Sequence, residues 1–151
     1  MSTVIQGLLF SLKQELFGIS VEHVLRVINP EKIMRIPKAP DFIVGAINLE
    51  GNVIPVADLA KKIDLGITDQ IEKCKIIILE MVHDDEPFQV GVLIDEVIDV
   101  VTMESSKLLP PPLENMGFDT YTLDGMLKVE EDFHMIINPG KVFEKELAVL
   151  A

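Results

Sequence analysis

The chain has 151 residues, of which 48% are hydrophobic, and its formal net charge at pH 7 is -12. This length is typical of one domain or of two small, closely packed subdomains. The acidic balance excludes nucleic-acid binding through clusters of Lys and Arg. The acidity serves either solubility or an acidic face for a basic partner.

A single cysteine, Cys74, excludes an internal disulfide and fits a reducing compartment. No apolar run approaches the ~20 residues that span a membrane. The N-terminal residues lack the basic and apolar regions of a signal peptide. We therefore expect a soluble, cytoplasmic protein with no direct membrane insertion.

Short segments rich in Val and Ile, separated by Gly, Pro, Asn and Asp, dominate the chain and are typical of β-strands. In chain order, the predicted strands are Val4–Lys13, Leu16–Ser20, Val24–Ile28, Met34–Ile36, Gly45–Leu49, Asn52–Asp58, Lys75–Val82, Phe88–Ile94, Ile98–Thr102, Met126–Val129 and His134–Ile137.

Helical patterns are weaker. We predict a turn of helix over Phe42–Val44 with Asp41 as its cap, and a short helix over Leu59–Asp64. A C-terminal helix is predicted over Pro139–Leu150, with Pro139 early in it. Many short strands with few helices indicate an all-β barrel or sandwich. Because amphipathic crossover helices are missing between the strands, a parallel α/β fold is disfavoured.

The chain contains an internal repeat. Residues 18–28 and 91–101 share one pattern of Gly and apolar positions without a gap, and Pro37 and Pro110 follow at the same offset. The repeat predicts two similar β-units, although strand-rich segments also produce such patterns by chance.

The two predicted units cover approximately residues 15–70 and 80–142 of a single domain, residues 1–151, and an exchange of termini or strands between them is left open. Units of this size bury little apolar surface alone. We therefore expect them to share an apolar core and to leave a cleft along their seam, where partners commonly bind.

Groups that carry enzymatic chemistry are missing from the sequence. The three histidines, His23, His83 and His134, share no ligand spacing, and Cys74 has no neighbouring Cys or His, so we expect no metal site. There is no phosphate loop, dinucleotide fingerprint or nucleophile elbow, so we expect no cofactor and no enzymatic activity. The adjacent acids Asp95 and Glu96 are interpreted as a solvated turn between two strands, and Cys74 as a core thiol.

The segment 45–59 is the most informative part of the chain. It is predicted to form a strand, a tight turn at Glu50-Gly51-Asn52 in which Gly51 takes positive φ, and a second strand. Pro55 cannot donate to a β-ladder, so its strand lies at an edge or has a free side there. An edge strand with few charges is a natural surface for a partner.

This segment, GAINLEGNVIPVADL, resembles the signature G-x-x-N-L-R-G-x-x-x-P-V-x-D-L of the CheW chemotaxis coupling-protein family. The resemblance extends from about Ile5 to about Val142. It implies an all-β fold with a few short helices, in which two five-stranded SH3-like β-barrels pack on a shared apolar core. It also implies a non-enzymatic adaptor of chemotaxis signal transduction, associated with receptor arrays at the inner membrane.

The resemblance implies two partners. The regulatory domain of the histidine kinase CheA would bind the first barrel around Val53–Val56, with Val53 and Pro55 as candidate contacts. The cytoplasmic tip of a chemoreceptor, a methyl-accepting chemotaxis protein, would enter the groove between the barrels. The candidate residues there are Val24, Arg26, Gly45, Glu50 and Gly51.

The chain departs from the family pattern at two charged positions. The family usually has Arg where this chain has Glu50, and it often has Glu where this chain has Arg26. We predict that Arg26 and Glu50 form an ion pair whose signs have been exchanged; two unrelated surface changes are the alternative. An exchanged pair would alter the choice of partner more than the fold.

Three other functions stay open. The first is an adaptor of a divergent chemosensory pathway, for example one that controls surface motility, with a different kinase or a response regulator as its partner. The second is a regulatory domain detached from a larger protein, and the third is an enzyme built on a β-barrel.

Overall fold

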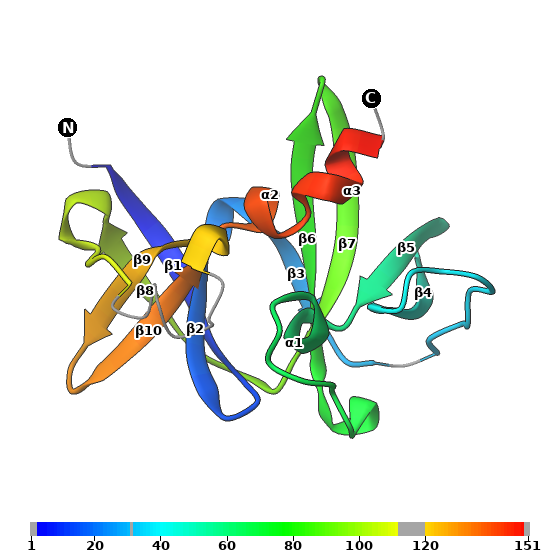
Figure 1. Ribbon diagram of the computed structural model, residues 1–151, viewed down its shortest axis with the longest axis horizontal. Helices are drawn as coiled ribbons and strands as arrows, with labels where there is room; N and C mark the ends of the chain where they lie inside the picture. The colour runs from blue at the N-terminus through cyan, green and yellow to red at the C-terminus, as the bar shows by residue number, and fades with distance from the viewer. Residues whose placement is uncertain (1–2, 31, 112–119, 150–151) are drawn as a thin grey trace.

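A computed structural model describes residues 3–30, 32–111 and 120–149 of the chain. The fold consists of two five-stranded sheets placed side by side, with short helices beside them (Figure 1). Sheet 1 has the order β8-β1-β2-β10-β9. Its strands are β1 (Val4–Leu12), β2 (Glu15–Ser20), β8 (Glu96–Glu104), β9 (Leu123–Val129) and β10 (Asp132–Ile137).

Sheet 2 has the order β3-β6-β7-β5-β4. Its strands are β3 (Val24–Ile28), β4 (Ile43–Leu49), β5 (Asn52–Ala57), β6 (Lys75–His83) and β7 (Glu86–Ile94). The helices are α1 (Leu59–Lys62), α2 (Pro139–Val142) and α3 (Glu144–Val149), and the 3-10 turns are η1 (Val21–His23), η2 (Ile71–Lys73), η3 (Ser105–Lys107) and η4 (Thr120–Thr122). The prediction of an all-β fold with a few short helices is confirmed.

The two sheets repeat one another in detail. In each, a parallel pair lies next to an antiparallel hairpin: β10 pairs with β2, and β5 pairs with β7. The repeated sequence patterns cover the two places where the chain leaves one sheet and enters the other, from β2 to β3 and from β7 to β8. Each entering strand carries a bulge, which leaves Leu25 and Ile98 without an opposite residue. Because the chain crosses between the sheets at these two places, β2 of the 15–70 segment lies in sheet 1, and β7 of the 80–142 segment lies in sheet 2.

The principal core lies between the sheets. Phe10 and Phe17 of sheet 1 stack with ring centroids 6.0 Å apart. They belong to the same buried cluster as Ile77 and Leu79 of β6 and Phe143 of the C-terminal segment. Because successive strand residues point to opposite faces, Ile76 and Ile78 of the same strand fill a separate cluster within sheet 2. Each such side chain stabilises the fold by about 1.5–3 kcal/mol on burial.

Two sequence predictions are wrong in the region between β3 and β4. The expected turn of helix over Phe42–Val44 is absent, since β4 begins at Ile43, whose amide donates to Pro40 O at 2.9 Å. The β-branched residues that follow favour a strand, and the Asp41 carboxylate pairs with Lys61 at 3.4 Å instead of capping a helix. The expected strand Met34–Ile36 is a single bridge between Met34 and Ala46.

The C-terminal helix was predicted as one element, and the structure divides it. Pro139 occupies the first turn of α2, as expected, and the Asn138 side chain accepts a hydrogen bond from the Lys141 amide at 3.2 Å. Phe143 then leaves helical geometry before α3 begins at Glu144. Phe143 is buried in the principal core at this break. Leu150 lies outside the described residues.

Candidate partner-binding surface

The turn of the β4–β5 hairpin is set by local chemistry. Glu50 and Gly51 both have positive φ, 52° and 88°, which is the geometry of the two-residue turns that suit twisted hairpins. The Gly51 amide donates to Asn48 Oδ1 at 3.0 Å and closes the turn from the strand side. The turn therefore projects the Glu50 carboxylate, whose side chain is 73% exposed, beyond the edge of sheet 2.

Arg26 and Glu50 lie within ion-pair distance. Their Nη2 and Oε1 atoms are 3.2 Å apart. Arg26 belongs to β3, and Glu50 follows β4, so the contact joins the two opposite edges of sheet 2 and shows that the sheet curls round on itself. Because both side chains are exposed to water, the pair stabilises the fold by at most ~1 kcal/mol.

The other predicted contact residues divide into exposed and buried sets. Val53 is 66% exposed, and Gly51 is exposed in the turn. Val24 is half-buried against the principal core. Gly45 is buried, and its Cα faces the carbonyl oxygen of Met34, so it serves packing and offers no contact surface.

Pro55 lies in a part of β5 that has no strand paired to it on the β7 side. β5 lies between β4 and β7, and not at an edge. However, its pairing with β7 is limited to Val56 and Ala57, so the missing amide of Pro55 leaves no gap in that ladder. The edge strand of this hairpin is β4.

Sequence reasoning missed several exposed apolar residues near the hairpin. Leu25 is 48% exposed because it is the extra residue of the β3 bulge. Val27 and Met34 are also exposed, on the same edge strand and in the segment that follows it. Every residue of β3 except Arg26 is apolar. The strand therefore lacks the alternation of apolar and polar residues from which an exposed face can be predicted.

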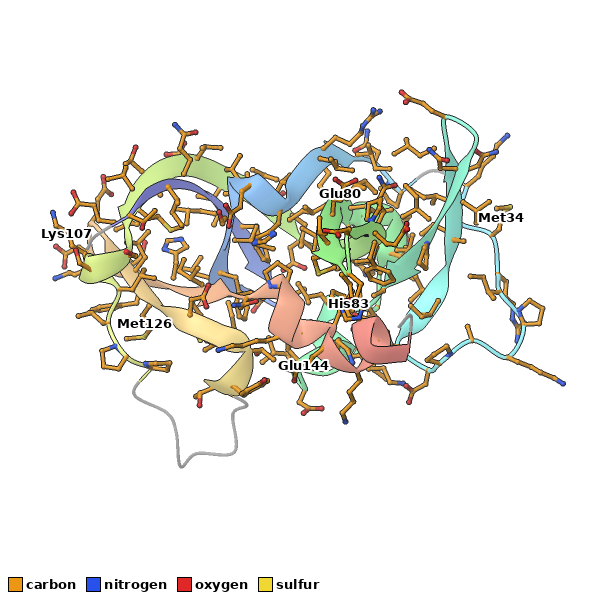
Figure 2. The ribbon with its side chains drawn as sticks, turned by 90° about the horizontal axis from the view of Figure 1, so that it is seen from above. Met34, Glu80, His83, Lys107, Met126 and Glu144 are labelled. Carbon is orange, nitrogen blue, oxygen red and sulfur yellow. The ribbon has the colours of Figure 1, made fainter. Side chains whose placement is uncertain are left out.

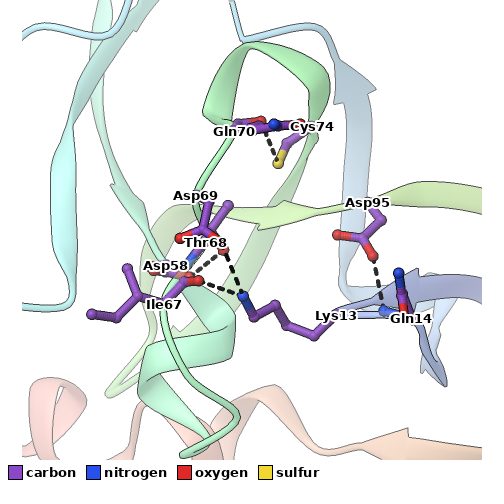
Figure 3. A network of polar contacts seen from close by, with 9 residues as sticks. All are labelled: Lys13, Gln14, Asp58, Ile67, Thr68, Asp69, Gln70, Cys74 and Asp95. Atoms are coloured by element: carbon purple, nitrogen blue, oxygen red, sulfur yellow. Dashed lines mark hydrogen bonds and ion pairs between the residues drawn. The ribbon is translucent and has the colours of Figure 1, made fainter.

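A network of polar contacts ties the sheets together at their seam (Figure 3). Lys13, in the β1–β2 turn, donates to Ile67 O at 2.6 Å, and the Gln14 amide donates to Asp95 Oδ2 at 3.1 Å. Asp95 forms the bend between β7 and β8, as predicted, but its carboxylate serves this contact and is not simply solvated.

A polar pocket of about 720 Å³ lies beside this network. Its lining comes from the β1–β2 turn, residues 68–74 and the β7–β8 bend: Ser11, Lys13, Gln14, Thr68, Asp69, Gln70, Lys73, Cys74, Asp95 and Glu96. None of the five residues predicted for the groove between the barrels lines this pocket.

The described residues contain no group of three or more His, Cys, Asp or Glu side chains able to hold a metal ion. His134 is buried, and neither ring nitrogen has a hydrogen-bond partner within the described part of the chain. Burial lowers the pKa of His134, which favours the neutral form of the imidazole. Burial and the nearby Asp95 carboxylate raise the pKa of the Cys74 thiol, which disfavours the nucleophilic thiolate.

Across residues 3–30, 32–111 and 120–149, no helix has the length and apolar character needed to cross a bilayer.

Comparisons with known proteins identify relatives of this chain. The chain is 31% identical over 140 residues to the chemotaxis protein CheW of Bacillus subtilis, a match that covers 92% of this chain and 86% of that protein. It is 28% identical over 96 residues to the protein FrzA of Myxococcus xanthus, which covers 64% and 58% of the two chains.

A solved structure is also similar. The scaffolding protein TtCheW of Thermoanaerobacter tengcongensis superposes with a TM-score of 0.75 at 31% identity, covering 89% of each chain. The protein-family model described as the CheW-like domain matches residues 6–147. Since this match covers nearly the whole chain, the protein belongs to the CheW-like domain family.

Proposed function

We propose that this protein is a non-enzymatic scaffold of chemotaxis signal transduction, which couples chemoreceptors to the histidine kinase CheA. The observation that carries the proposal is the β4–β5 hairpin, which presents exposed Val53 in β5 and, in its turn, Glu50 of the Arg26–Glu50 ion pair. The relatives named as chemotaxis protein CheW and as a scaffolding protein support it. The protein would act in the cytoplasm, beside receptor arrays at the inner membrane.

No covalent step is needed for this role. A scaffold that contacts the kinase differently in its two conformational states shifts the equilibrium between them, and the size of the shift equals the difference in binding free energy. The kinase regulatory domain would bind at Val53 and Pro55. The receptor tip would bind near Arg26, Glu50 and Gly51, with Val24 and Gly45 supporting the backbone behind them.

We expect the protein to bind the regulatory domain of its own organism's CheA with a micromolar or lower dissociation constant, measured by calorimetric titration. Val53→Glu should weaken this binding at least tenfold, because it puts a charge into an apolar contact. Val82→Glu is the matched control, since Val82 lies on β6 of the same sheet and is 69% exposed. Absence of binding by the unaltered protein would refute the proposal, and equal effects of both variants would move the kinase contact elsewhere.

The exchanged ion pair favours the second candidate function, an adaptor of a divergent chemosensory pathway. Arg26→Glu and Glu50→Arg each place like charges where the paired atoms now lie 3.2 Å apart. Each single variant should lose up to ~1 kcal/mol of stability, and the double variant should regain it.

The same double variant separates stability from partner choice. If partners read the signs of the two charges, it should bind the native receptor tip about tenfold more weakly while unfolding at the original temperature. Binding equal to that of the unaltered protein would show that partners do not distinguish the two arrangements.

A further inference from the structure

The segment between β3 and β4 concentrates positive charge in an acidic protein. Lys32, Arg35 and Lys38 lie within seven residues that contain no acid, although the chain as a whole carries a net charge of -12. All three side chains are exposed, and among the described residues, which exclude Glu31, none of the three has an ion-pair partner. By contrast, the neighbouring Arg26 and Lys61 are paired with Glu50 and Asp41.

An apolar pocket of about 440 Å³ opens in the same region, and Lys32 belongs to its lining. It lies between the end of β3 and the end of β4 and is lined by Ile28, Asn29, Lys32, Met34, Ile47, Asn48 and Leu49. Met34, at 48% exposure, stands on its rim. The region around Met34 lies at the opposite end of the molecule from Lys107 and Met126 (Figure 2), and so away from sheet 1.

The internal repeat allows the pocket lining to be compared with the corresponding part of sheet 1. Val101, Leu127 and Val129 of sheet 1 occupy the positions of the lining residues Ile28, Ile47 and Leu49. In sheet 1 these three residues belong to or pack against the apolar cluster that contains Met103, which is 1% exposed.

Met103 reaches that position because β8 continues to Glu104, three residues beyond Val101. β3 stops at Ile28, and Asn29 and Pro30 follow, so no residue of β3 plays the same part in sheet 2.

We propose that residues 32–38 and this pocket form a docking surface for an acidic segment of a partner protein, with one Met-like or Leu-like side chain of that segment in the pocket. The three exposed cations, of which Lys32 lines the pocket, complement the charge of an acidic segment. An apolar side chain in a preformed pocket surrounded by polar groups is a common arrangement at protein interfaces. A concave pocket fits a single side chain better than it fits a flat lipid surface. The proposal goes beyond coupling to kinase and receptor and does not depend on it.

The test uses the full chain and a fluorescent twelve-residue peptide with a central Leu flanked by Glu residues, measured by anisotropy. We expect saturable binding that weakens about tenfold in Lys32→Glu/Arg35→Glu/Lys38→Glu. The matched control is Lys107→Glu/Lys128→Glu/Lys145→Glu, which changes the net charge equally but lies elsewhere, and it should keep most of the affinity. Replacing the central Leu of the peptide by Ser should also weaken binding about tenfold.

Several outcomes would overturn the proposal. The first is no peptide binding by the unaltered protein at millimolar concentration, and the second is an equal loss in both triple variants, which would indicate only a net-charge effect. The third is co-sedimentation with phosphatidylserine vesicles that the loop variant abolishes, without peptide binding, which would assign the surface to a membrane. Circular dichroism of each variant verifies that it is folded, and the kinase titration described above is read independently.

Discussion

Replacing Gly45 by Ala is expected to lower the free energy of unfolding by about 3 kcal/mol, because there is no room for a side chain at this position. An added Cβ would overlap the carbonyl oxygen of Met34 and lie 2.6 Å from Ile33 Cγ2. Met34 cannot move away easily, since its backbone exchanges two hydrogen bonds of 2.7 Å with Ala46. For a chain of this size, the loss corresponds to a melting temperature about 6–12 °C lower in a thermal unfolding experiment.

Gly51→Ala is the matched control for this prediction. Gly51 also has positive φ, 88°, but no atom lies within 4 Å of the place where its Cβ would be. It should therefore lose only about 1–2 kcal/mol, from backbone conformation alone. Equal losses in the two variants would show that the Ile33-Met34 segment gives way, and that Gly45 is needed only for its dihedral angles.

Asp58→Ala is expected to cost about 3 kcal/mol of stability, since it removes two hydrogen bonds to a buried carboxylate. Asp58 is 2% exposed, and it accepts hydrogen bonds from the amide and the hydroxyl of Thr68 at 2.9 and 2.6 Å. Thr68 lies in the loop in which the Ile67 carbonyl oxygen accepts a hydrogen bond from Lys13 of sheet 1 (Figure 3). Loss of the anchor should therefore also speed hydrogen exchange across this loop, measured by mass spectrometry.

The control for this second prediction is Asp69→Ala. The Asp69 side chain is 82% exposed and lies 3.8 Å from Lys13 Nζ, so its removal should cost less than ~1 kcal/mol. If urea unfolding gives the same stability for both variants, Asp58 does not anchor the loop.

Strands and turns were predictable because their signals are local. Apolar residues, β-branching and turn residues placed β1, β2, β5, β6 and β7 close to their observed bounds, and Pro139 marked the start of α2. Local signals failed where a tertiary contact decides the outcome. Asp41 stands at a position typical of a helix cap, but its carboxylate forms an ion pair with Lys61, which is distant in sequence.

Pairing between strands was harder to predict than the strands themselves. Nothing in the local sequence of β2 indicates that its partner is β10, because such pairing depends on the sheet and not on neighbouring residues. The repeat of residues 18–28 in 91–101 pointed to two similar units, but a pattern of apolar positions does not show that each copy crosses between sheets.

The candidate surface was only partly predictable. The proximity of Arg26 and Glu50 was expected because their charges are exchanged relative to the family pattern. Their separation in the sequence alone gives no reason to expect it, since they lie on opposite edges of sheet 2. The seam pocket was missed because its lining depends on how the β1–β2 turn meets residues 68–74. The exposure of Leu25 depends on a bulge, which its sequence does not mark.

The crossing of strands between sheets has a consequence for folding during synthesis. Sheet 2 takes all its strands from the continuous stretch of β3 to β7 and can form once Ile94 has left the ribosome. Sheet 1 needs both ends of the chain, since Phe17 of β2 pairs with Met135 of β10. The β1–β2 hairpin, with the apolar faces of Phe10 and Phe17, must therefore wait for the C-terminal strands, and during this interval the nascent chain is most open to misassembly and most in need of a chaperone.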